Sequence, residues 1–148
     1  MNDFISRVLD LHLQQTALRG DCGILAEQLT DPNMQRQIAD LRGQHARQTA
    51  ELAAMLAEAA DGPMTPAEAD AVAGDEHAPA VADRETPDAA YALLASVARA
   101  EERLLQAYEE AAAAADVDTP AQSLLRRHHV ALTTSLQRLR VVASSVFA

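Results

Sequence analysis

Four long segments of the chain carry an apolar residue at every third or fourth position, and this spacing limits the possible folds more than any other feature. The segments cover residues 3–30, 32–61, 87–116 and 120–147. Spacings of three and four are typical of helices that bury one face against neighbours, whereas strands alternate at every second residue. The pattern predicts an all-α protein in which four helices enclose a shared core.

Helix starts are marked by an Asp or Thr followed directly by proline. The first residue of such a pair caps a free backbone N–H, and proline at the first helical position gives up only a donor that had no partner. Thr119 with Gln122 also fits a capping box, in which the two side chains bond each other's backbone N–H groups. The pairs are Asp31-Pro32, Thr65-Pro66, Thr86-Pro87 and Thr119-Pro120.

The connections between the helices set the expected topology. Only a few residues separate the first helix from the second and the third from the fourth, and short loops join antiparallel neighbours. Residues 62–86 form a longer connection with a short helix expected from Pro66 to Ala73, and it can span a helix of about 42 Å. We therefore expect one domain, residues 1–148, built as a ferritin-like four-helix bundle: two antiparallel hairpins joined by a long crossover. An up-down-up-down bundle is the alternative.

Composition excludes several classes of function. The chain has 148 residues and a formal net charge of −10, and its acidic residues are spread along the whole length. Binding to nucleic acid needs a basic face, which this sequence lacks. No stretch approaches the roughly 20 apolar residues of a membrane span, and the single cysteine cannot form a disulfide framework. We expect a cytoplasmic protein that binds neither nucleic acid nor membrane.

Two segments carry a resemblance to a known family. The first hairpin contains TALRGDCGILAEQLTDPNMQRQIADLRGQHARQTAELAAML, and the third helix contains LLASVARAEERLLQAYEEA, with Glu101 and Tyr108 seven residues apart. Both resemble an uncharacterised bacterial ferritin-like family, a four-helix domain of unknown function, in whose third helix a Glu and a Tyr recur at this spacing. The resemblance implies the fold and leaves the activity open.

Polar residues interrupt the apolar stripes at five positions. His45, Glu101 and His128 each fall between apolar residues of their helix, as do Gln15 and Gln48. A buried carboxylate or imidazole is costly unless it is paired or coordinated. Each of these side chains is therefore expected to have a partner inside the bundle.

The ferritin-like di-iron site uses a Glu from two helices and a Glu-x-x-His motif from each of the other two. His45 has Arg42 at the glutamate position of that motif, and His128 has Leu125. The complete di-iron site is therefore absent from the sequence.

Two interpretations of the buried polar residues remain. A reduced site of Glu101, His45 and His128, with Tyr108 beside the ligands, would hold iron or another transition metal. Alternatively, two hydrogen-bonded pairs, Glu101 with His45 and Tyr108 with His128, fix the relative heights of the helices. Cys22 is expected to act as a small apolar residue on the buried stripe.

No complete catalytic set is present, and His12 is expected on an exposed flank. We therefore expect a non-enzymatic protein that acts by self-association, as a homodimer, or through a protein partner. The alternative is a metal-binding ferritin-like protein with the reduced His/Glu site.

Overall fold

The computed structural model describes residues 3–59 and 87–146 of the chain. In these two ranges all regular structure is helical: α1 (Asp3–Gln28), α2 (Pro32–Ala59), α4 (Pro87–Ala114) and α5 (Pro120–Val146). The helices begin where the sequence places them, and α1 and α4 end two residues earlier than expected; the expected last residues of α2 and α5 lie outside the described ranges. The short helix expected from Pro66 lies outside the described residues. None of the four helices is both long and apolar enough to cross a membrane.

Two helix starts show the expected caps. The Asp31 carboxylate accepts a hydrogen bond of 2.9 Å from the N–H of Met34 at the start of α2. At the start of α5, Thr119 Oγ1 accepts one of 3.2 Å from the N–H of Gln122. The Gln122 side chain bonds back to the N–H of Asp118, one residue before the expected capping-box partner. These bonds satisfy N–H groups that a helix start otherwise leaves free.

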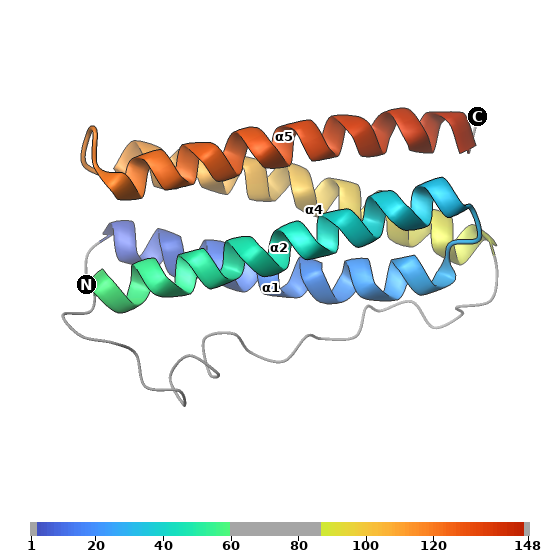
Figure 1. Ribbon diagram of the computed structural model, residues 1–148, viewed down its shortest axis with the longest axis horizontal. Helices are drawn as coiled ribbons and strands as arrows, with labels where there is room; N and C mark the ends of the chain where they lie inside the picture. The colour runs from blue at the N-terminus through green and yellow to red at the C-terminus, as the bar shows by residue number, and fades with distance from the viewer. Residues whose placement is uncertain (1–2, 60–86, 147–148) are drawn as a thin grey trace.

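The four helices pack side by side as a bundle (Figure 1). α1 contacts α2 and α4, and α5 also contacts α2 and α4, so that α1 lies diagonally opposite α5. Each neighbouring pair is antiparallel, and α2 and α4 therefore run in the same direction. The chain makes two hairpins, α1–α2 and α4–α5, whereas in an up-down-up-down bundle α4 would run against α2.

Apolar side chains from all four helices form one core. Leu, Val, Ile and Met side chains fill most of it, because the aromatic content is only 3%. Packing between closely spaced helices favours such residues. The most deeply buried apolar residues are Val8, Leu11, Cys22, Leu25, Met34, Ile38, Leu52, Val97, Leu104, Tyr108, Ala111, Leu125 and Leu132.

The buried face of α1 is wider than one stripe. His12, expected on an exposed flank, is only 4% exposed, and that expectation was wrong. α1 contacts two neighbouring helices, so positions on both sides of the central stripe are covered. Thr16, one turn further along, is buried for the same reason.

Candidate metal centre

The two buried pairs expected from helix height are both present. Nε2 of His45 on α2 lies 2.5 Å from Oε1 of Glu101 on α4, and both side chains are almost fully buried. Tyr108 Oη on α4 lies 2.9 Å from Nδ1 of His128 on α5. The prediction of hydrogen-bonded pairs at two levels of the bundle is confirmed.

Gln15 on α1 joins these two pairs. Its Nε2 lies 2.9 Å from Nδ1 of His45 and 2.6 Å from Oε1 of Gln48. Its Oε1 accepts a hydrogen bond from the Tyr108 hydroxyl. The six residues Gln15, His45, Gln48, Glu101, Tyr108 and His128, which we call the buried polar chain, therefore form one connected network that draws on all four helices.

The hydrogen-bond partners determine where each proton lies. Because the Gln15 amide donates to Nδ1 of His45, that nitrogen is the acceptor, and the neutral ring carries its proton on Nε2. The ring therefore donates to Glu101. Tyr108 uses its only proton on Gln15, so its oxygen can form a hydrogen bond with His128 only when His128 carries its proton on Nδ1. With His128 in that tautomer, the donors from His128 to His45 all point toward Glu101, and the second N–H of Gln15 is donated to Gln48.

The other end of the chain approaches the surface between α2 and α5. Nε2 of His128 lies 3.3 Å from Oε1 of Glu51, whose side chain is 51% exposed. Both residues line a cavity of about 230 Å³. Burial lowers the pKa of His128, against an opposing effect of Glu51, and Arg127 lowers it further. His128 is therefore neutral near pH 7 and carries one ring proton, which it can donate either from Nδ1 to Tyr108 or from Nε2 to Glu51.

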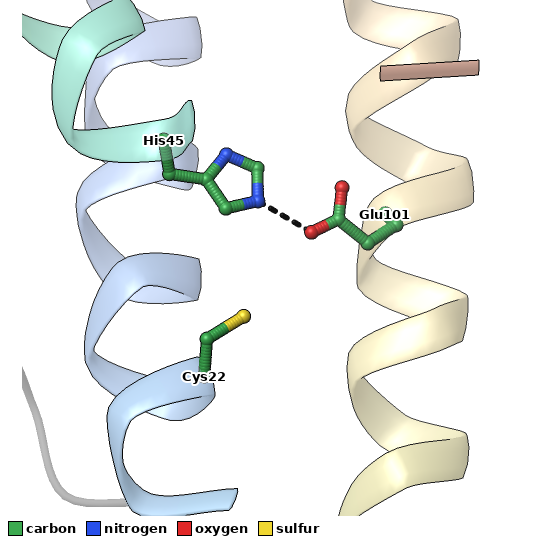
Figure 2. A group of neighbouring side chains, drawn as sticks. All are labelled: Cys22, His45 and Glu101. Atoms are coloured by element: carbon green, nitrogen blue, oxygen red, sulfur yellow. Dashed lines mark hydrogen bonds and ion pairs between the residues drawn. The ribbon is translucent and has the colours of Figure 1, made fainter. Parts of the chain in front are cut away.

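Cys22 on α1 joins the opposite end. One ligand atom each of Cys22, His45 and Glu101 lies within 4.8 Å of the other two, and all three residues are buried. Figure 2 shows the three side chains reaching from three helices toward one common space. We call this cluster the inner site, and the contact between His128 and Glu51 the outer end.

Burial raises the pKa of the Cys22 thiol, and the nearby carboxyl groups of Glu101 and Asp21 raise it further. The Arg42 guanidinium acts in the opposite direction; it lies across α1 at Gly23, where a Cβ atom would come within 3.1 Å of it. Cys22 is therefore a neutral thiol near pH 7 unless a cation takes the place of its proton. A thiol, an imidazole and a carboxyl group are all metal ligands once deprotonated.

The structure brings together two of the three ligands suggested by the sequence. His45 and Glu101 are in contact, whereas His128 bonds Tyr108 and approaches Glu51. Tyr108 is linked to the pair at the inner site through Gln15. Among the described residues, the third potential ligand at the inner site is Cys22, not His128.

Sequence reasoning missed the part played by Cys22. Its place on the buried stripe of α1 was visible, but its height relative to Glu101 depends on how α1 and α4 are aligned. The contact between Gln15 and Tyr108 reveals that alignment. Cys22 lies seven residues after Gln15, and Glu101 lies seven residues before Tyr108. Because α1 and α4 are antiparallel, these two steps lead in the same direction along the bundle and bring Cys22 to the height of Glu101. The spacing between Gln15 and Cys22 was the available signal.

Comparisons with models of protein families, with curated proteins and with solved structures gave no match to this chain. The resemblance to a ferritin-like family therefore stays a prediction. The geometry of the buried residues carries the functional argument.

Proposed function

We propose that this chain is a ferritin-like helical-bundle protein that binds one divalent transition metal ion through Cys22, His45 and Glu101. The observation that carries the proposal is the meeting of a thiol, an imidazole and a carboxyl group, from three helices, within 4.8 Å. A buried carboxylate without a counter-charge is costly in an apolar core, and a buried thiolate is equally costly. A metal ion removes that cost, because two anionic ligands neutralise its charge.

The mixture of ligands favours zinc. Sulfur ligands select against magnesium and calcium, which prefer oxygen, and the set of one S, one N and one O suits a tetrahedral zinc ion with one further position. Around such an ion the ligand atoms lie about 3.4–3.6 Å apart. Binding therefore requires His45 and Glu101, now 2.5 Å apart, to separate by about 1 Å while the thiolate moves inward.

Residues around the inner site support this role. Histidines that bind metals are usually held by a hydrogen bond to their other ring nitrogen, and Gln15 holds His45 in this way. A cavity of about 450 Å³ between α1 and α4 is lined by Asp21 and Ala100, the chain neighbours of Cys22 and Glu101. Its lining also includes Asp10, Glu110 and Arg103, so three carboxylates and one guanidinium give this cavity a net negative charge.

The bundle arrangement supports the ferritin-like part of the proposal. The α1–α2 and α4–α5 hairpins, with α2 and α4 parallel, give the helix order of that fold, and ferritin-like proteins bind metals between facing helices. In this chain a cysteine stands among the ligands and the Glu-x-x-His motifs are missing. Zinc is therefore proposed ahead of iron, which the sequence allowed for a site of two histidines and one carboxylate.

Cobalt titration tests the proposal directly. Co²⁺ occupies zinc sites, and its bond to a thiolate gives a strong near-ultraviolet absorption band. We expect one equivalent of Co²⁺ to produce this band, zinc to displace it, and Cys22→Ser to remove it while lowering zinc affinity by more than roughly a hundredfold. Elemental analysis of protein purified without added metal provides an independent measurement.

His129→Gln is the matched control. His129 lies on α5 beside His128, but it pairs with Glu109 at the surface, so its replacement should leave the band and the affinity unchanged. If Cys22→Ser, His45→Gln and Glu101→Gln all bind cobalt as the unaltered protein does, the inner site is not a metal site.

The expected homodimer and protein partner stay predictions. Sedimentation velocity at micromolar concentration, with and without zinc, tests the homodimer. A single monomeric species in both samples contradicts self-association and leaves the metal proposal standing.

A further inference from the structure

The path of polar contacts from Glu101 to Glu51 has one more contact than there are N–H and O–H protons to fill it. The path has five contacts: Glu101–His45, His45–Gln15, Gln15–Tyr108, Tyr108–His128 and His128–Glu51. Neutral His45 and His128 supply one N–H each, Tyr108 supplies one O–H, and Gln15 directs one N–H along the path, which makes four protons. Gln48 is a side branch, whose contact with Gln15 either amide can supply.

We infer that the buried polar chain is a two-state relay, in which binding at the inner site moves the proton of His128 from Nδ1 to Nε2. The metal-dependent part rests on the proposed function, whereas the relay itself is a property of the hydrogen bonds alone. His128 is then a residue that responds to the inner site without touching it.

In the first state the contact without a proton is at the outer end. His45 donates to Glu101, the Gln15 amide donates to His45 and Gln48, Tyr108 donates to Gln15, and His128 donates to Tyr108. Nε2 of His128 then faces Glu51 with a lone pair. The distance there is 3.3 Å, the longest for which the chain gives a value.

The second state reverses every donor. Rotation of the Gln15 and Gln48 amides by half a turn exchanges their nitrogen and oxygen without moving the chain. His45 then donates from Nδ1 to Gln15, Gln15 donates to Tyr108, and Tyr108 donates to Nδ1 of His128. His128 carries its proton on Nε2 and donates it to Glu51. The contact without a proton is now at the inner site, between His45 and Glu101.

A metal ion selects the second state. Its bond to Nε2 of His45 requires the lone pair on that nitrogen, so the ring proton must lie on Nδ1. Gln15 can accept that proton only after its amide rotates. The rotated amide donates to Tyr108, and the Tyr108 hydroxyl then donates to Nδ1 of His128. The thiol proton of Cys22 leaves for solvent, while the ring protons are redistributed within the two imidazoles by exchange with solvent. One proton is released for each ion bound.

The coupling also acts in the opposite direction. A site that affects a second site is affected by it to the same extent, so groups that stabilise Nε2–H on His128 strengthen metal binding. Glu51 is such a group. Arg47 and Arg127 line the same cavity and set the local charge there, and Tyr108 is the group that faces His128 from α4.

Nitrogen-15 NMR of the histidine rings tests the relay without any metal, because two-bond couplings distinguish the two tautomers. In the unaltered protein we expect His128 to be protonated on Nδ1. In Glu101→Met, which removes the acceptor and keeps the side-chain length, the first state leaves the His45 proton without a partner. The second state gains the bond to Glu51, so His128 should change to Nε2–H.

If His128 has the same tautomer in both proteins, the relay is wrong. Tyr108→Phe combined with Glu101→Met gives the matched control, because it breaks the chain between Gln15 and His128 and should prevent the change. A change of tautomer that persists in the double variant also overturns the relay. Chemical shifts of the backbone amides verify that each variant is folded.

Zinc alone provides the second part of the experiment. One equivalent should convert His128 of the unaltered protein to Nε2–H, and Glu51→Ala should lower zinc affinity by about fivefold or more. In a Tyr108→Phe background, Glu51→Ala should have no effect, whereas attraction through space would persist there. If zinc binds and His128 does not change, the relay fails; if zinc does not bind but Glu101→Met changes His128, only the proposed function fails.

Discussion

His45 and His128 lie in the same buried polar chain, but their surroundings differ. His45 is fully buried, with Gln15 on one ring nitrogen and Glu101 on the other. His128 has Tyr108 on one nitrogen, and its other nitrogen faces the half-exposed Glu51 at a cavity. A buried imidazole without water must find both partners within the protein, whereas one at a cavity can exchange a partner for water. The inner histidine is therefore the more constrained of the two.

Truncation of the two rings should show this difference most strongly. We expect His45→Ala to lower the free energy of unfolding by about 3–5 kcal/mol, because it leaves a cavity and strands Glu101 and the Gln15 amide without their partner. His128→Ala should cost about 2 kcal/mol, since water in the adjacent cavity can replace the lost ring nitrogen. Urea unfolding followed by circular dichroism measures both values.

His129→Ala serves as the control for this measurement, because the His129 side chain is partly exposed and pairs with Glu109 at the surface. Its cost should be below about 1 kcal/mol. Equal costs for His45→Ala and His128→Ala would remove the distinction between the inner site and the outer end.

The Tyr108 hydroxyl connects the two regions, and its removal should have a smaller effect. Tyr108→Phe keeps the ring in the core but leaves Gln15 Oε1 without its donor and His128 Nδ1–H without its acceptor. We expect a loss of about 1–3 kcal/mol in the free energy of unfolding. Tyr91→Phe, at a side chain that is 55% exposed, should change it by less than about 0.5 kcal/mol. A loss from Tyr108→Phe as small as that from Tyr91→Phe would mean that the two regions are not joined through this hydroxyl.

The sequence was sufficient for the helices and for the pairs, and insufficient for the link between them. Proline positions placed the helix starts, and residue heights counted along the helices placed His45 beside Glu101. The position of Gln15 between both pairs depends on the alignment of α1 with α2 and α4 together. Side-chain reach across three helices cannot be read from spacing on one of them, and the inclusion of Cys22 was lost for the same reason.

The width of a buried face is a second limit of sequence reasoning. His12 was assigned to the surface because it lies beside the central stripe of α1, yet contact with two neighbours buries both edges of that stripe. In a bundle, positions adjacent to the stripe need to be judged with the packing of both neighbours in view.

The smallest expected effect is the pH dependence of the outer end. Burial lowers the pKa of His128 in the folded protein. Between this lowered pKa and the ordinary value of about 6.5, the unfolded chain binds more protons than the folded one. Stability is therefore complete above the ordinary value and is lost as the pH falls through that range. The thermal midpoint should fall less in His128→Gln than in the unaltered protein between about pH 7.5 and pH 5.5.

Glu51→Ala sharpens this test. The Glu51 carboxylate raises the pKa of His128 against the effect of burial, so its removal lowers that pKa further and should steepen the loss of stability. Arg127 remains in both proteins and cannot account for the difference. Three slopes are therefore expected in a fixed order: shallowest for His128→Gln, intermediate for the unaltered protein and steepest for Glu51→Ala. Equal slopes for the unaltered protein and Glu51→Ala would show that His128 and Glu51 do not interact, and an identical slope in all three would show that His128 does not contribute to the pH dependence.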